Sequence, residues 1–277
     1  MQKLICSLFF QGIEKSKISD IVTFQLRLLG FTPNYLKAGD KEISYDLNAL
    51  IEWIEKGERA IRIISEPSVN NSMNYWTLFE FDENYKVLSL TWCNDHMDFL
   101  IDKEDFIKLL LSEKFLYGVC YDMSDAFNES CTNIEYVKNV IGKKKISTTK
   151  DQFGDLIVNI SNNCGRKERI NSLEFIAAPI MWFGNKFNEF IPLQDILKFN
   201  GSESVKAQGG EYVLLKLFEL SDDPALEKNR KRQCQFWEFF NLQEVIKNYE
   251  KRTAIDLDAY MKDLIEKKKK KRNNSKG

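Results

Sequence analysis

The sequence predicts an α+β protein with an antiparallel or mixed sheet, flanking helices and a C-terminal helical segment. Helix-like and strand-like segments both occur along the 277 residues, but they do not alternate strictly as in a doubly wound parallel sheet. Two strand-like segments, 76–81 and 87–92, flank a short polar turn, which is typical of an antiparallel hairpin. The composition, 43% hydrophobic and 29% charged, is that of an ordinary globular protein.

The N-terminal segments begin with a strand and two helices. Residues 4–10 are apolar and of strand length, so we expect a buried strand there. Apolar residues recur at helical spacing over 16–29, and Gly30 marks a helix end. A second amphipathic helix is expected over 47–56, with Asp46 as its N-cap.

More strands and one helix are expected in the rest of the N-terminal half. Aromatic and β-branched residues in these strands suit a pleated, half-buried surface. The expected segments are strands 60–64, 76–81, 87–92 and 115–121, a helix from residue 102 or 103 to 111, and a weak helix over 133–141.

The C-terminal half combines fewer strands with more helices. A hydrophobic run over 173–183 is interrupted by Pro179, so it does not form one long central strand. Residues 212–220 are the clearest candidate for a central strand. The other expected segments are strand 156–160 and helices 193–199, 222–240, 242–250 and 255–272.

We expect residues 1–266 to form one α+β domain. The basic stretch 142–150 is either a linker between two subdomains, about 1–141 and 151–266, or an exposed loop, and the loop is favoured. Residues 267–277 contain seven Lys or Arg and no acid, and are expected to form a disordered tail or a solvated helix end. A weak nucleic-acid or membrane contact by this tail is the remaining alternative.

The charge distribution argues against a nucleic-acid-binding domain. Without the basic tail, residues 1–266 contain 33 basic and 41 acidic residues. A nucleic-acid-binding surface is normally basic, whereas an acidic body is compatible with a basic protein partner.

The six cysteines predict free thiols in a reduced cytoplasm. They form no CxxC pair, and Cys93 and Cys120 lie in apolar, strand-like runs where a thiol packs as a small hydrophobe. The even count also permits disulfides. The N-terminal apolar run is too short for a signal peptide, and no segment approaches the roughly 20 apolar residues of a membrane span.

The sequence contains no motif that predicts catalysis, a metal or a cofactor. The single histidine, His96, follows Cys93 and Asp95, but neighbouring strand residues point to opposite faces, so a catalytic dyad is disfavoured. The acidic residues near Asp98 and Asp102 lack the spacing of a calcium loop. Phosphate-binding loops and the hydrolase GxSxG motif are also missing from the sequence. We therefore expect a protein that is not an enzyme.

Two dense aromatic clusters are expected to contribute mainly to the core. The first lies around Met181-Trp182-Phe183, and the second is Phe236-Trp237-Glu238-Phe239-Phe240. Four aromatic residues within five helical positions cannot all face one side, so part of the second cluster must be exposed or lie at an interface.

A family resemblance comes from the residues around these clusters. Met181-Trp182-Phe183-Gly184 is followed by Phe187, Ile191-Pro192, Leu197, the strand 212–220, Arg232-Gln233 and Phe236. This arrangement resembles the immunity proteins that bacteria encode beside polymorphic toxins, and that bind and neutralise a cognate toxin. The resemblance spans roughly residues 175–247 and implies a non-enzymatic, protein-binding function.

An acidic body fits this implication, because it can be steered onto a basic toxin. The expected contact residues are acids near loops: Glu80, Asp82, Glu83, Asp95, Asp98 and Asp102. Two alternatives stay open, namely a structural or assembly component of a phage or secretion system and an enzyme with a carboxylate-based site.

Overall fold

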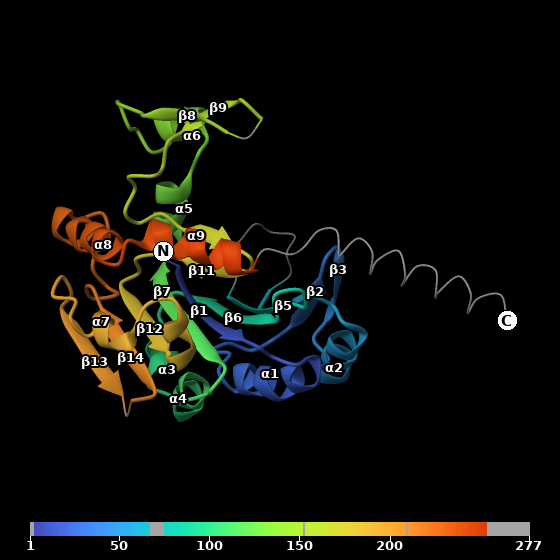
Figure 1. The fold of residues 1–277 in the computed structure, drawn as a ribbon. Coiled ribbons are helices and arrows are strands. Elements are labelled where there is room, and N and C mark those ends of the chain that lie inside the picture. The colour runs from blue at the N-terminus through green and yellow to red at the C-terminus, as the bar shows by residue number, and fades with distance from the viewer. Residues whose placement is uncertain (1–2, 67–74, 152, 209, 254–277) are drawn as a thin grey trace.

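The computed structural model describes residues 3–66, 75–151, 153–208 and 210–253. Its centre is a ten-stranded sheet with the strand order β13-β14-β12-β7-β1-β6-β5-β4-β2-β3 (Figure 1). Neighbouring strands in this order pair antiparallel. The predicted α+β class, with an antiparallel sheet, flanking helices and C-terminal helices, is confirmed.

The strands of the main sheet come from both halves of the chain. They are β1 (Leu4–Gln11), β2 (Tyr35–Ala38), β3 (Lys41–Ser44), β4 (Ala60–Ile64), β5 (Trp76–Asp82), β6 (Val87–Asn94), β7 (Phe115–Asp122), β12 (Ile180–Gly184), β13 (Ser204–Gln208) and β14 (Tyr212–Lys216). Two small hairpins lie outside it, β8 (Thr148–Lys150) with β9 (Leu156–Val158) and β10 (Glu168–Ile170) with β11 (Leu173–Phe175).

Most of the helices connect these strands along the chain, and the last two follow the final strand. They are η1 (Lys15–Lys17), α1 (Ile18–Arg27), α2 (Leu47–Lys56), α3 (Asp98–Ile101), α4 (Glu104–Leu110), α5 (Met123–Ser130), α6 (Ile134–Asn139), η3 (Asn185–Glu189), α7 (Leu193–Ile196), α8 (Glu227–Phe239) and α9 (Leu242–Thr253).

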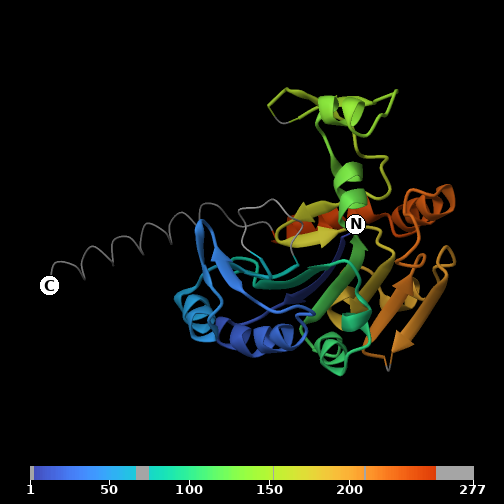
Figure 2. The same cartoon turned by 180° about the vertical axis from the view of Figure 1, so that it is seen from behind.

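The sheet separates two apolar clusters because successive side chains of a strand point to opposite faces. In β1, Leu8 packs on the face that carries α1, α2 and α4, whereas Phe9 packs on the other face. On that second face, β10–β11, α8 and α9 lie over the sheet near β7 and β12 (Figures 1 and 2). The same face borders a cavity over β4, β5 and β6.

A narrow extension stands away from the sheet. We call residues 131–163 the arm; it contains α6, β8 and β9, and α5 forms its stem (Figures 1 and 2). The basic stretch 142–150, expected as a loop or linker, leads into β8 within this arm. The predicted strand 156–160 is the short β9 of the same hairpin.

Local sequence signals set the ends of several elements as expected. Helix α2 spans the predicted residues, and the Asp46 carboxylate accepts a hydrogen bond from the Asn48 amide at 2.9 Å. Gly57 follows in the left-handed conformation that a glycine adopts readily. The predicted hairpin 76–92 is β5–β6.

Other predictions about the sheet were wrong in detail. The hairpin β2–β3 was not expected, because its eight strand residues alternate polar and apolar types only weakly. The strand predicted over 212–220 ends at Lys216 and lies next to the edge strand β13 rather than at the centre. Its partner strand β12 begins only after Pro179, which has no amide hydrogen to donate to a neighbouring strand. Regular strand pairing therefore ends there, and Leu217 and Phe218 are buried in the core without strand structure.

The predicted basic tail, 267–277, and the helix predicted over 255–272 lie outside the described residues. Among the described residues, none of the helices combines the length and the apolar content that a membrane crossing requires.

Candidate protein-binding surface

A groove lies on the second face of the sheet, beside the arm. Its cavity measures about 390 Å³, and its floor consists of side chains from β1, β4, β5 and β6. The floor is partly polar: the hydroxyl groups of Ser7 and Thr91 are 3.0 Å apart across neighbouring strands. Trp76 and Leu78 add apolar surface. A floor of this kind can hold a polypeptide segment with both polar and apolar groups.

The wall of the groove consists of α5 and the β10–β11 hairpin. Met123, Ala126 and Phe127 of α5 line it, and Phe127 is largely exposed. Across from them, the Tyr121 hydroxyl donates a hydrogen bond to Glu174 at 2.5 Å. Burial, followed by the charge of Glu174, raises the pKa of Tyr121 well above its ordinary value, so this hydroxyl stays a donor.

The two carboxylates that line the groove are both paired. Glu80 lies 2.6 Å from the Arg169 guanidinium, and Glu174 lies 3.2 Å from the Lys167 ammonium. The Arg62 guanidinium stacks over the Trp76 ring at 4.7 Å. The groove is therefore lined by ion pairs and an aromatic-cation contact, which suit recognition of a polar polypeptide surface.

The arm has a very small core of its own. Val137 of α6 and Val158 of β9 are the buried apolar side chains among its described residues. The Asn133 side chain caps α6 by accepting from the Tyr136 amide at 2.9 Å, and the Tyr136 ring contacts Phe127 of the stem edge-on. With so few buried contacts, the position of the arm depends on its attachment to the body.

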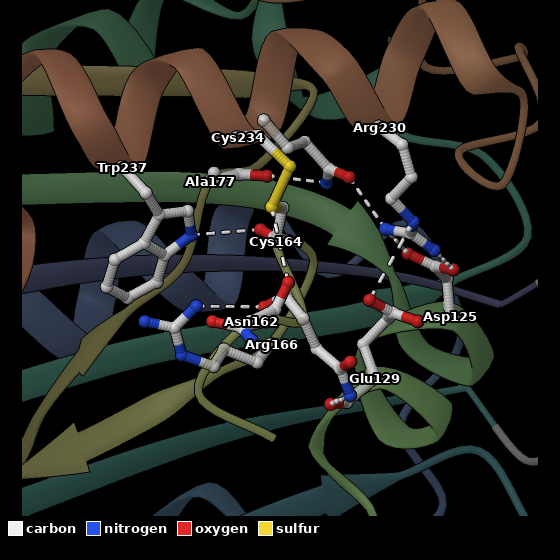
Figure 3. Close-up of a disulfide and its surroundings, with 11 residues drawn as sticks. Asp125, Glu129, Asn162, Cys164, Arg166, Ala177, Arg230, Cys234 and Trp237 are labelled. Atoms are coloured by element: carbon white, nitrogen blue, oxygen red, sulfur yellow. Dashed lines mark hydrogen bonds and ion pairs between the residues drawn. A yellow bond between two sulfur atoms is a disulfide. The ribbon is translucent and has the colours of Figure 1, made fainter. Parts of the chain in front are cut away.

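Helix α8 fixes one side of that attachment through a charged cluster. The Arg230 guanidinium contacts both oxygens of the Asp125 carboxylate, donating to one of them at 3.1 Å, and lies 3.8 Å from Glu129 (Figure 3). Burial raises the pKa of Asp125, an effect that the hydrogen bond from Arg230 opposes. The cluster joins stem helix α5 to a helix more than 100 residues further along the chain.

The chain leaving the arm is fixed to the same helix by a disulfide between Cys164 and Cys234 (Figure 3). The Trp237 indole donates to the Cys164 carbonyl at 2.9 Å, and the Arg166 guanidinium stacks on the Trp237 ring at 3.7 Å. We call this disulfide, these contacts and the Arg230 cluster the arm base. Both chain segments that enter and leave the arm are thus attached to α8.

The six acids predicted as contact residues do not form one cluster. Glu80 lies in the groove and is paired with Arg169. Asp82 begins the β5–β6 turn and accepts a hydrogen bond from the Ser172 hydroxyl at 2.7 Å, while Glu83 is exposed in that turn. The other three lie beyond the far end of the eight-residue strand β6, roughly 25 Å away at about 3.3 Å per residue.

Asp95 is engaged inside the protein. Its carboxylate lies 2.8 Å from the buried Lys3 ammonium and accepts from the Tyr75 hydroxyl at 2.5 Å. The ammonium group of Lys3, and then the hydrogen bond from Tyr75, lowers the pKa of Asp95. Asp102 is exposed between α3 and α4, and the backbone of Asp98 begins α3, while its side chain lies outside what the structure describes.

Cys93 and His96 do not share a catalytic arrangement. Cys93 is a buried residue of β6, and burial raises the pKa of its thiol to about 11, so it is protonated at neutral pH. His96 is exposed beyond the end of the strand. Within the described part of the chain, His, Cys, Asp and Glu side chains form no group of three or more that could hold a metal ion.

The residues that carry the family resemblance lie mostly in the core. Met181, Trp182, Phe183, Phe187 and Phe236 are all buried. The Gln233 side chain is also buried and donates to the Ala177 carbonyl at 2.7 Å. The expectation that part of the cluster 236–240 is exposed or lies at an interface agrees with Phe239, half of which is exposed.

The cysteines were predicted as free thiols, and this holds for four of them. Cys6, Cys93 and Cys120 are free and buried, and Cys131 is free and half-buried. The pairing of Cys164 with Cys234 was not predicted, because 70 residues separate them and nothing in their spacing marks them as partners. A disulfide is more typical of an oxidising compartment than of the reduced cytoplasm predicted from the sequence.

Comparison with known proteins gives little further guidance. No family model matches the chain, and no curated protein matches it. Among solved structures, the chain is similar to part of the complex between the toxic C-terminal tip of CdiA from Pseudomonas aeruginosa and its immune protein. That similarity covers 44% of this chain and 87% of the other, at 11% identity and a TM-score of 0.26, which is too low to relate the two folds.

Sequence reasoning missed the arm and its base. The run of lysines over 142–150 was noted, but its position on a projection follows only from the tertiary structure. Helix α8 contains several other basic and polar residues, so no pattern in the local sequence distinguishes Arg230 as an ion-pair partner. Phe153, an apolar residue set among polar neighbours in the sequence, is exposed in the structure and was an available indication of a contact surface on the arm.

Proposed function

We propose that this chain is a non-enzymatic immunity protein, which binds a cognate toxin domain and neutralises it. The observation that carries the protein-binding part is the arm, an anchored projection with exposed apolar side chains beside a groove of mixed polarity. Exposed apolar groups gathered on one element mark interaction sites in soluble proteins. The toxin part is supported by the resemblance of residues 175–247 to immunity proteins.

The acidic body supports association with a basic toxin. Residues 1–266 have an excess of eight acids over bases, and such a field accelerates encounter with a cationic partner at low salt. Glu83 and Asp102 are exposed and can meet a partner without breaking an internal contact. Glu80, Asp82 and Asp95 would first have to exchange their internal partners, so a smaller contribution is expected from them.

The pairing of groove carboxylates favours binding over catalysis. Glu80 and Glu174 are each held by a cation, and a general acid or base needs a carboxyl group free to exchange protons with a substrate. A hydrolase that uses this groove would need one of these pairs to open.

The test is protection of a growing cell. A bacterial host expresses the product of the gene immediately upstream of the one that encodes this chain, with and without the chain, and growth is followed. We expect growth arrest without the chain and normal growth with it, together with a stable complex of the two purified proteins in size-exclusion chromatography. Continued arrest in the presence of the soluble, folded chain would overturn the proposal.

The same chromatography separates the assembly alternative. A structural component of a phage or secretion system would elute alone as a large, defined homo-oligomer and would not protect the cell.

A further inference from the structure

We infer that the arm makes the contact that holds the toxin, and that it fits a toxin surface that has an acidic patch and a neighbouring apolar pocket. This inference rests on the proposed function. The body and the arm then have separate roles in binding: the acidic body raises the association rate, and the arm lowers the dissociation rate.

The charge of the arm is opposite to that of the body. Residues 136–150 contain five lysines and no acid: Lys138, Lys143, Lys144, Lys145 and Lys150. All five are exposed, and of these Lys143 lies 3.5 Å from Glu129 of the stem. The arm thus presents a cluster of cations at its outer part, and a surface rich in Asp and Glu is complementary to it.

Apolar side chains accompany these cations. Phe153, Val140 and Leu156 are 80%, 65% and 60% exposed, which is high for residues of their size. Phe153 lies in the turn between β8 and β9, where the Asp151 carboxylate accepts from the backbone amides of Phe153 and Asp155, both at 2.9 Å. A large aromatic side chain on a held turn can act as an anchor in a partner's pocket.

The arm base fixes the position of the arm before a partner binds. The disulfide, the Arg230 cluster and the Trp237–Cys164 hydrogen bond attach both of its ends to α8 (Figure 3). Two further hydrogen bonds join the two ends to each other: the Lys167 amide donates to the Ser130 hydroxyl at 2.8 Å, and the Asn163 side chain donates to the Glu129 carbonyl at 2.8 Å. An element fixed in this way loses little conformational entropy when it docks.

A protein partner fits the arm better than a nucleic acid. Sites for single-stranded nucleic acid combine cations with several aromatic rings on which bases stack. Phe153 is the one strongly exposed ring between residues 131 and 163 of the described chain, and Val140 and Leu156 offer no stacking face.

The experiment measures association and dissociation rates between the full chain and the purified product of the upstream gene that arrests growth in the protection test. One variant reverses arm charges (Lys144→Glu, Lys145→Glu and Lys150→Glu), and its control reverses three exposed lysines of the body (Lys103→Glu, Lys206→Glu and Lys247→Glu). A second variant, Phe153→Ser, is matched by Leu111→Ser, which alters an exposed apolar residue at the end of α4. Thermal unfolding verifies that each variant is folded.

We expect each arm variant to dissociate about tenfold faster or more, as for a central contact residue, and each body control to dissociate as the unaltered chain does. Equal dissociation rates for arm variants and controls would overturn the inference and leave the proposed function standing. If the unaltered chain does not bind the toxin, both fail. Binding of a 20-nucleotide RNA that the arm charge reversal abolishes, with toxin binding retained, would also overturn the inference.

Discussion

The main sheet and the arm are held in place by different forces. The sheet buries an apolar cluster on each face, with Trp92, Trp182 and Phe183 among its fully enclosed side chains. The arm encloses only Val137 and Val158 among its described residues. It depends on a disulfide, ion pairs and hydrogen bonds at its base. Burial therefore stabilises the scaffold, while a few polar and covalent contacts position the element that projects from it.

The largest expected effect on stability comes from removing a buried aromatic side chain of the main sheet, compared with removing an exposed one of the arm. Trp182→Ala removes a side chain that packs edge-on against Phe106 at 5.4 Å, and we expect a loss of about 3–5 kcal/mol in unfolding free energy. Phe153→Ala in the arm is the control, with an expected change within about 0.5 kcal/mol. Urea unfolding measures both, and similar losses for the two variants would contradict the comparison.

The disulfide is expected to contribute the next largest effect. Replacing both partners, Cys164→Ser with Cys234→Ser, releases a 70-residue cross-link and should lower the stability by about 2–4 kcal/mol. Hydrogen exchange should increase most at the arm base and in α8. Titration of six free thiols in the folded, unreduced protein would show that the bond does not form and would sink this prediction.

The Arg230 cluster should have a smaller effect. Arg230→Ala leaves Asp125 without its cation in a half-buried position and Glu129 with Lys143 alone, and we expect a loss of about 1–3 kcal/mol. The double variant with Asp125→Asn should recover part of this loss, because it removes the unpaired charge. Strictly additive losses in the two single variants and the double variant would show that the pair does not interact.

The smallest test compares one carboxylate in each region as the pH falls. The pKa of Asp95 is lowered by Lys3, so its stabilising contribution is complete above its ordinary value of 3.8 and is lost as the pH falls through the lowered value. The pKa of Asp125 is raised by burial, so protonation on acidification favours the folded state there. Melting temperatures between pH 6 and 3 measure both effects.

The advantage of the unaltered chain over Asp95→Asn should shrink on acidification, and its stability relative to Asp125→Asn should rise. A constant difference across this pH range for both variants would contradict the assignment. The expected shifts are small, because both side chains keep some exposure to solvent.

The elements that sequence reasoning located correctly are those set by neighbouring residues. Helix α2 begins after the Asp46 cap and ends at Gly57, and both contacts lie within a few positions of the helix. The β5–β6 hairpin follows from two aromatic, β-branched runs around one polar turn. Sequence reasoning did not locate the β2–β3 hairpin, because the stability of this hairpin comes from pairing with β4 rather than from its own composition.

The predicted contact acids show where charge alone misleads. Sequence reasoning selected six acids near loops, but it could not tell that Glu80 pairs with Arg169 or that Asp95 pairs with Lys3. The partner of Glu80 is 89 residues away in the chain. An acid is available to a partner only if no internal cation holds it, and that depends on which distant segments the fold brings together.

The sequence by itself determined the α+β class, the local elements and an acidic body with basic segments, since these depend on composition, periodicity and contacts between near neighbours. Only the tertiary structure decided that the lysines of 138–150 lie on a projecting arm and that Cys164 meets Cys234. It also decided that Arg230 holds Asp125, 105 residues earlier. Contacts over such separations result from the packing of the whole chain around its sheet, so no local pattern records them.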